Sequence, residues 1–173
     1  MECLSVGLDD IPAGSRCVVD TNILLYAEHG TSAQAQRLIR RSADGEISAV
    51  LPQTVWHELA HKLMLAEAQS RGLVSGGNPA AKLAARPETV RSLRLYRAKV
   101  KSLRDLGFGF ESCLFADLTE RAFALQERHG LLINDAVVLA VALRLKVDCL
   151  VSSDKAFRGV REIALYFPSD LKH

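Results

Sequence analysis

Apolar and polar residues follow two alternating patterns along this chain. Short runs of β-branched and other apolar residues are typical of buried strands, and longer stretches with an apolar residue every three or four positions are typical of helices. The expected strands are 16–20, 46–51, 111–118, 148–151 and 162–167. The expected helices are 31–43, 54–70, 88–104, 119–129 and 134–145. Strands that alternate with helices of this length predict a three-layer α/β/α fold around a mostly parallel sheet.

The middle of the chain departs from this alternation. Residues 72–79 are rich in glycine and end with Pro79, a composition typical of a loop. The helix expected at 88–104 has one apolar face and one basic face. Its apolar face consists of Val90, Leu93, Val100 and Leu103. We therefore expect a single domain over residues 1–173 that carries a basic helical insertion at about 71–104.

Composition supports a globular chain with an uneven charge distribution. Its 173 residues are 49% hydrophobic and 24% charged, which suits one buried core and excludes a disordered or fibrous protein. Residues 71–104 contain nine Lys or Arg and one acid, Glu88, so their net charge is +8, which leaves −6 for the rest of a chain whose total is +2. This separation favours an anionic partner for the insertion, although a solvated helix face has the same appearance.

The cysteines and the apolar runs exclude several other classes of protein. The chain contains no C-x-x-C pair, so zinc-ribbon and thioredoxin-like sites are excluded and reduced, buried thiols are expected. The cysteines are Cys3, Cys17, Cys113 and Cys149. The first residues carry acids where a secretory signal would carry cations, and no stretch approaches the roughly 18 apolar residues that a membrane span requires. We expect a cytoplasmic protein that has no membrane partner.

Four acids stand where this fold would bring them to one edge of the sheet. Asp20 ends the first expected strand and Asp154 follows the strand at 148–151, so both leave the sheet at its carboxyl edge if the two strands are parallel. Ligands bind at that edge in α/β folds. Asp135 lies in the first turn of one helix, and Glu58 lies in the early turns of another. Each acid alone has an ordinary explanation as a helix-start or turn residue.

Taken together, the four acids predict a metal site. Neighbouring carboxylates repel one another and raise one another's pKa, and a divalent cation removes that repulsion. Oxygen ligands select Mg²⁺ or Mn²⁺ over zinc, and these ions bind through a few carboxylates, water and substrate phosphate. The chemistry that this arrangement predicts is phosphodiester hydrolysis, in which a metal lowers the pKa of the attacking water and a second metal, if one binds, stabilises the leaving oxygen.

Four segments carry a family resemblance. They are CVVDTNILLY, TVWHELAHKL, LLINDAVVLAVAL and LVSSDKAF, in that order along the chain. The most specific part is N-D-A at the start of a helix of small residues, followed nineteen residues later by the S-x-D strand exit, whereas D-x-N after a strand is common in turns. In this order the segments resemble PIN-domain nucleases, and most of all the VapC-type toxins of toxin–antitoxin pairs.

This resemblance implies a PIN-like fold and a ribonuclease that uses Mg²⁺ or Mn²⁺. It also implies an RNA substrate and an antitoxin protein as partner, and the sequence leaves open whether a second copy of the chain associates. The implied catalytic and metal-binding residues are Asp20, Glu58, Asp135 and Asp154. Asn22 would support the site through hydrogen bonds, and Ser152 would contact the last acid or a metal-bound water. The chain departs from the compact family pattern in the insertion at 71–104.

A second motif lies on the same helix as Glu58. His57-Glu58-Leu59-Ala60-His61 is a formal H-E-x-x-H, in which two imidazoles one turn apart bind zinc and the glutamate activates water in a metallopeptidase. Against a zinc metallopeptidase, the chain has no recognisable third-ligand signature downstream, Lys62 would place a cation beside the zinc, and three of the aspartates would stay unexplained. A further alternative is a non-catalytic PIN-like module that binds RNA or protein, and the four intact acids argue against it.

Five cations in the insertion are candidates for RNA binding. They recur at spacings of three and four, which would align them on one helix face as a track for a phosphate backbone. They are Arg91, Arg94, Arg97, Lys101 and Arg104. A solvated helix face, or a docking face for an acidic segment of an antitoxin, would have the same pattern.

Overall fold

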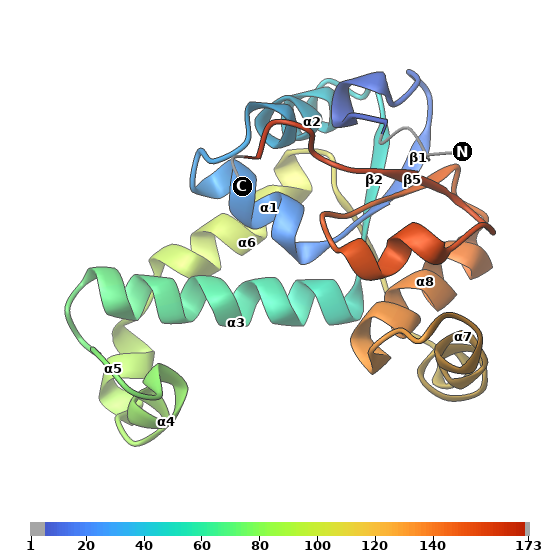
Figure 1. The fold of residues 1–173 in the computed structure, drawn as a ribbon. Coiled ribbons are helices and arrows are strands. Elements are labelled where there is room, and N and C mark those ends of the chain that lie inside the picture. The colour runs from blue at the N-terminus through green and yellow to red at the C-terminus, as the bar shows by residue number, and fades with distance from the viewer. Residues whose placement is uncertain (1–5, 172–173) are drawn as a thin grey trace.

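The computed structural model describes residues 6–171, which form a five-stranded sheet with helices on both faces (Figure 1). The strand order is β3-β2-β1-β4-β5, and each neighbouring pair is parallel. The strands are β1 (Arg16–Val19), β2 (Ser48–Pro52), β3 (Gly109–Glu111), β4 (Cys149–Val151) and β5 (Ala164–Tyr166). The three-layer α/β/α fold with a parallel sheet is therefore confirmed.

The helices connect these parallel strands as crossovers. The first set comprises α1 (Thr21–Glu28), α2 (Ala33–Ala43), α3 (Gln53–Ser70), α4 (Pro79–Ala84), α5 (Pro87–Ser92) and α6 (Leu95–Asp105). The second comprises α7 (Ala122–His129) and α8 (Ile133–Leu145). Three short helical turns complete the described chain, η1 (Leu8–Asp10), η2 (Asp117–Arg121, a π-helix) and η3 (Lys155–Gly159). Because α1, α2 and α6 cover one face and α8 the other, β4 and all but the first residue of β1 and β2 are buried (Figure 1).

Burial on both faces explains the composition of the central elements. In β1, residues Cys17–Val19 are fully buried, and in α8 every residue from Ala136 to Ala142 is buried. Strands that are covered on both faces carry continuous apolar runs, and a helix that is apolar all round belongs in a core. The expected strands at 16–20, 46–51, 148–151 and 162–167 are present as β1, β2, β4 and β5.

The thiols that the structure describes agree with the expectation of reduced cysteines. Cys17 and Cys149 are register partners on β1 and β4, both are buried, and their sulfur atoms lie 3.1 Å apart without a disulfide. Cys113 is free and half-buried, and Cys3 lies outside the described residues.

The helix expected at 88–104 is in fact two helices. The α5 helix ends at Ser92, Leu93 is extended and fully buried, and α6 begins at Leu95. The carboxylate of Glu67 causes this break, because it accepts the backbone N–H groups of Arg94 at 3.0 Å and Tyr96 at 2.9 Å. A side chain from α3 thus satisfies the free N–H groups at the start of α6. The prediction of one straight helix was wrong, and the five candidate cations do not share one helix face.

The prediction of a strand over residues 111–118 was also wrong. Only Gly109–Glu111 pairs with β2, and the chain turns helical shortly afterwards because the carboxylate of Asp117 accepts the N–H of Leu114 at 2.9 Å. Before β3, Gly107 adopts φ +78 and approaches α2 so closely that a Cβ there would lie 2.4 Å from the carbonyl oxygen of Ser42. The sequence patterns also missed α1 and α4.

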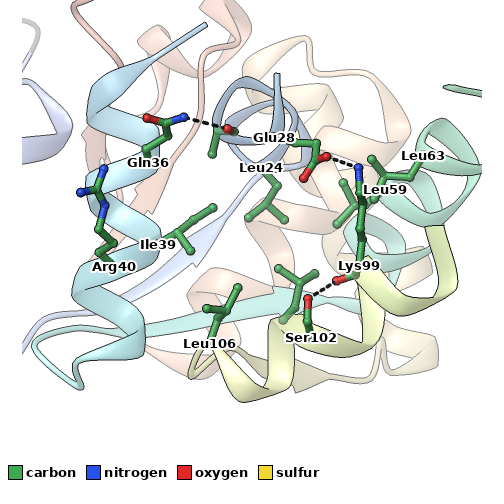
Figure 2. A pocket seen from close by; sticks show the side chains of 12 residues that line it. Leu24, Glu28, Gln36, Ile39, Arg40, Leu59, Leu63, Lys99, Ser102 and Leu106 are labelled. Carbon is green, nitrogen blue, oxygen red and sulfur yellow. Dashed lines mark hydrogen bonds and ion pairs between the residues drawn. The ribbon is translucent and has the colours of Figure 1, made fainter. Parts of the chain in front are cut away.

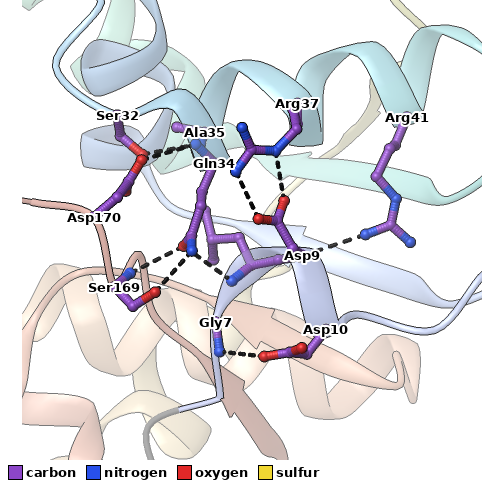
Figure 3. A network of polar contacts seen from close by, with 11 residues as sticks. Gly7, Asp9, Asp10, Ser32, Gln34, Ala35, Arg37, Arg41, Ser169 and Asp170 are labelled. Carbon is purple, nitrogen blue, oxygen red and sulfur yellow. Dashed lines mark hydrogen bonds and ion pairs between the residues drawn. The ribbon is translucent and has the colours of Figure 1, made fainter.

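A polar network joins the two ends of the described chain to α2 (Figure 3). The hydroxyl of Ser32, which caps α2, donates to Asp170 at 2.7 Å, and the side chain of Gln34 donates to the hydroxyl of Ser169 at 2.7 Å. Arg37 pairs with Asp9 near the N-terminal end. These contacts hold η1 and the segment that follows β5 against α2. None of the helices within residues 6–171 has the length and apolar character to cross a membrane.

Candidate active site

The strand order creates a natural site beside β1. The chain moves from β1 to β2 and β3 on one side, whereas β4 and β5 lie on the other, so the segments that follow β1 and β4 diverge. Ligands in open α/β sheets bind at this kind of divergence, outside the carboxyl ends of the strands. Val19 and Val151 are register partners, which brings Asp20 and Ser152 level at that edge.

Hydrogen bonds join the acids that follow β1 and β4. Asp20 caps α1, and its Oδ1 atom accepts the N–H of Thr21 at 2.7 Å. The hydroxyl of Ser152, which is 1% exposed, donates to Oδ2 of Asp20 at 2.7 Å and accepts the N–H of Asp154 at 3.0 Å. Asp154 caps η3 by accepting the N–H of Ala156 at 2.8 Å. Ser152 therefore fixes Asp20 and the backbone of Asp154 relative to each other.

Glu58 on α3 is connected to the same edge through α1. The hydroxyl of Thr21, a residue that is 1% exposed, donates to Oε2 of Glu58 at 3.0 Å. The ammonium of Lys62 lies 2.6 Å from Oε1 of Glu58 and donates to Oδ1 of Asn22 at 3.4 Å. The predicted supporting residue Asn22 thus contacts the site through Lys62. Sequence reasoning did not select Thr21 or Lys62 as site residues, and their only signal was their spacing, one residue after Asp20 and one turn after Glu58.

Neighbouring acids contribute to the pKa shifts of Asp135 and Asp20. Burial, together with the charges of Asp154, Asp20 and Glu58, raises the pKa of Asp135 to about 6. Burial also raises the pKa of Asp20, with further increases from Glu58 and Asp154, and these outweigh the opposing hydrogen bonds from Ser152 and Thr21. Mutual repulsion of this kind is what a bound cation relieves.

The donor set suits a hard divalent cation better than zinc. All four candidate ligands are carboxylates, and oxygen donors favour Mg²⁺ or Mn²⁺. The ammonium of Lys62 already pairs with Glu58, so this edge accepts a positive charge. Within residues 6–171, however, no three His, Cys, Asp or Glu side chains stand close enough together to enclose a metal ion. The carboxylates would have to move toward one another, or share the ion with water and phosphate, to bind it.

The H-E-x-x-H segment lacks the surroundings of a zinc centre in the part of the chain that is described. His57 and His61 are both exposed, and the ring of His57 packs edge-on against Trp56 with the ring centroids 5.3 Å apart. Glu58, the glutamate that this motif would use to activate water, is held by Thr21 and Lys62 instead. The structure therefore gives the peptidase alternative no third ligand.

The candidate RNA-binding cations are spread over two helices and the break between them. Arg91 lies on α5 and forms an ion pair with Glu88. Arg97 lies 5.6 Å from the ring centroid of Tyr96 and donates to the carbonyl of Val90. Arg94, Lys101 and Arg104 are exposed. Arg91 lies in the lobe that α4 and α5 form beyond the C-terminal end of α3, whereas Lys101 and Arg104 lie on α6, which runs back along α3 to the main core (Figure 1). We call residues 71–104 the basic arm.

A separate cavity lies among α1, α2, α3 and α6 (Figure 2). Its volume is about 350 Å³, and none of the four acids lines it. Apolar side chains such as Leu24, Leu59 and Leu106 form much of its wall, and an ion pair between Glu28 and Lys99 crosses one side. The cavity is therefore distinct from the acidic edge.

Comparison with known proteins gives one family and a consistent fold. The PIN domain family model matches residues 17–163. A toxin–antitoxin complex from Klebsiella pneumoniae has a TM-score of 0.57 at 19% identity, covering 86% of this chain and 95% of that one. VapBC2 from Rickettsia felis, bound to a DNA fragment from its promoter, has a TM-score of 0.54 at 16% identity, with coverages of 88% and 98%.

A third structure extends the same similarity. VapC20 from Mycobacterium tuberculosis, described as a toxin that cleaves the sarcin-ricin loop, has a TM-score of 0.52 at 17% identity, covering 85% of this chain and 98% of that one. No curated protein sequence matches the chain. The resemblance seen in the sequence is confirmed, because the family model spans both strands and all four acids of the candidate site. The chain belongs to the PIN domain family.

Proposed function

We propose that this protein is a metal-dependent endoribonuclease that acts as the toxin of a toxin–antitoxin pair. The observation that carries the proposal is the hydrogen-bonded edge at the point where the strand order diverges: Ser152 joins Asp20 to the backbone of Asp154, and Thr21 joins the start of α1 to Glu58. The charges of these three acids contribute to the raised pKa of Asp135 on α8, which supports its place in the same site. A PIN domain supplies the fold, and the solved structures of similar fold include a toxin that cleaves RNA and two toxin–antitoxin assemblies.

In this proposal Asp20, Glu58, Asp135 and Asp154 hold Mg²⁺ or Mn²⁺ and orient the reacting groups. The ion, when bound, supplies positive charge for the phosphoryl oxygens and lowers the pKa of the attacking water. A water oxygen forms a bond to phosphorus, the bond from phosphorus to the ester oxygen breaks, and the leaving oxygen takes up a proton. The hydroxyls of Ser152 and Thr21 keep Asp20 and Glu58 in position during this reaction.

The end of the basic arm that carries Arg91 would bind the RNA backbone at a distance from the acids. Glu58 lies near the start of α3 and the arm begins after its end, and the rise of an α-helix puts about 18 Å between Glu58 and Ser70. An RNA that contacts both would extend along α3.

Each arm cation that contacts a phosphate should reduce the slope of log affinity against log salt by about 1 when it is replaced by alanine. Arg94, Lys101 and Arg104 are the first positions to test because they are exposed.

Two associations and a compartment complete the proposal. An antitoxin protein would inhibit the nuclease, and a second copy of the chain would form a homodimer. Light scattering of the purified protein, with and without antitoxin, would detect both complexes by their mass. The cytoplasm is the compartment where such an enzyme meets RNA.

A cleavage assay with matched variants tests the proposed activity. The wild-type protein should cleave RNA with Mn²⁺ and lose that activity in EDTA, and Asp20→Asn should abolish cleavage while the circular dichroism spectrum stays unchanged. Asp44→Asn is the control, because Asp44 is exposed at the end of α2, before β2 begins and hence at the opposite edge of the sheet. Cleavage by Asp20→Asn at the wild-type rate would refute the assignment.

A further inference from the structure

Lys62 lies at the junction of the two helices that flank the acidic edge. Its ammonium is 2.6 Å from Oε1 of Glu58 on α3 and 3.4 Å from Oδ1 of Asn22 on α1. The side chain is 40% exposed, so a molecule in solution can reach it. The other carboxylate oxygen of Glu58 is occupied by the hydroxyl of Thr21, next to Asp20. A cation with two partners therefore stands within the group of residues that the proposed reaction uses.

An ordinary helical ion pair does not account for this arrangement. A glutamate followed four residues later by a lysine stabilises an exposed helix by a few tenths of a kcal/mol, and such a pair needs no second partner. Lys62 has a second partner, and that partner, Asn22, is two residues after Asp20. Both contacts are to residues beside the carboxyl edge, so the ammonium stands between Glu58 and the segment that follows Asp20.

A lysine in this position complements the charge of a reacting phosphodiester. The phosphoryl oxygens gain negative charge on the way to the transition state, so an ammonium beside them stabilises the transition state more than the bound substrate. Lysine binds phosphate as a point charge on a flexible stem, which lets it leave one anion for another. A divalent cation at Glu58 would compete with Lys62 for that carboxylate and release the ammonium toward the substrate.

We propose that Lys62 is a catalytic residue that contacts a non-bridging oxygen of the scissile phosphate. This inference rests on the proposed nuclease function and adds to it a residue outside the four acids. In the metal-free protein Lys62 neutralises Glu58, and during the reaction it stabilises the charge on phosphorus. The four acids bind the cation, and Lys62 binds the anion.

The test compares Lys62→Met, which removes the charge and keeps the length of the stem, with Lys62→Arg, which keeps a cation. We expect kcat for RNA cleavage to fall about 10²-fold in Lys62→Met with a smaller change in KM, and to recover at least tenfold in Lys62→Arg. The thermal midpoint should stay unchanged, because an exposed pair contributes little to stability. Lys146→Met is the matched control, since Lys146 is exposed at the opposite end of α8 from Asp135.

Binding of Mn²⁺ alone, measured by calorimetry, gives a readout that does not depend on cleavage. Lys62→Met should bind Mn²⁺ as tightly as the wild type or up to about fivefold more tightly, because no ammonium competes for Glu58. A kcat of Lys62→Met within threefold of the wild type would overturn the proposal. A clear loss of Mn²⁺ affinity in Lys62→Met would also overturn it, because Lys62 would then only position Glu58. A wild-type protein that neither binds Mn²⁺ nor cleaves RNA would overturn the proposed function and this inference together, whereas an active wild type with an active Lys62→Met removes this inference alone.

Discussion

Asp117 and Asp135 are two carboxyl groups withdrawn from water in opposite surroundings. Asp117 is 0% exposed and accepts hydrogen bonds from the N–H of Leu114 at 2.9 Å, Arg121 at 2.7 Å and Arg144 at 2.9 Å. Burial by itself raises the pKa of Asp117, but these donors outweigh it and leave the pKa below its usual value. Asp135 has three acids around it instead, and its pKa rises to about 6.

The contrast separates a structural carboxylate, Asp117, from the carboxylate that we propose to be functional, Asp135. Asp117 is neutralised within the protein, and the same Arg144 also pairs with Glu111 and donates to the carbonyl of Ser112, so the network fixes the segment between β3 and α7. At Asp135 the causes of the pKa shift are burial and three negative charges, and no cation of the described residues offsets them. A carboxyl group in such surroundings is typical of a site that binds a ligand. Mutations at the two positions should therefore have opposite effects on stability and activity.

The largest expected effect is on catalysis at the acidic edge. Asp135→Asn should reduce Mn²⁺-dependent RNA cleavage by about 10³-fold, because it removes a charge that the proposed metal and transition state require. The same variant should unfold at an equal or higher temperature than the wild type in EDTA, since it removes a repelled carboxylate. Calorimetry and a single-turnover assay measure the two effects. A variant that is strongly destabilised and keeps its rate of cleavage per folded molecule would place Asp135 in the class of Asp117.

The next largest effect is on stability at the arginine network. Asp117→Asn leaves Arg121 and Arg144 without their buried anion, and breaking a buried pair by removing one partner destabilises proteins by about 3 kcal/mol or more. Urea unfolding should show this loss, while the folded fraction keeps its rate of cleavage. If cleavage per folded molecule fell as far as in Asp135→Asn, the separation of the two roles would be wrong.

Glu67 is a third carboxylate, and we expect its replacement to reduce stability in the same way as that of Asp117, by a smaller amount. It is buried, and the N–H groups of Tyr96 and Arg94 and the side chain of Arg71 keep its pKa below the usual value against the effect of burial. Glu67→Gln keeps an accepting oxygen and loses the charge, so we expect a loss of about 1 kcal/mol. Hydrogen exchange should rise in α4 and α5 of the basic arm and not in β1. Uniform exchange across the chain would mean that Glu67 does not anchor the arm.

The sequence predicted the acidic edge because its signals are local. A strand that ends at Asp20 and a strand that leads to Asp154 meet at one edge once the sheet is parallel, and no long-range contact is needed to infer it. The errors occurred where distant side chains decide the backbone. Glu67 interrupts the expected helix at Leu93, and Asp117 turns an apolar stretch into helix, and both act through hydrogen bonds that no periodic pattern records. For the same reason the contacts of Lys62 with Glu58 and Asn22 became visible only in three dimensions.

The smallest expected effect is the pH dependence of stability in the metal-free protein. The folded state takes up a proton at Asp135 near pH 6, whereas the unfolded chain does so near the ordinary pKa of 3.8, so between these values the folded state binds more protons. The free energy of unfolding in EDTA should therefore rise by about 1 kcal/mol as the pH falls from 7 to 5, a modest gain because solvent screens a half-buried group. Asp117 has the opposite sign, since its stabilisation is complete above pH 3.8 and is lost as the pH falls further, through its lowered pKa. Urea titrations at pH 7, 6 and 5 should show a larger rise in the wild type than in Asp135→Asn, where the raised pKa of Asp20 still contributes. A rise of the same size in Asp135→Asn would assign the titration to another group and remove the electrostatic contrast between the two aspartates.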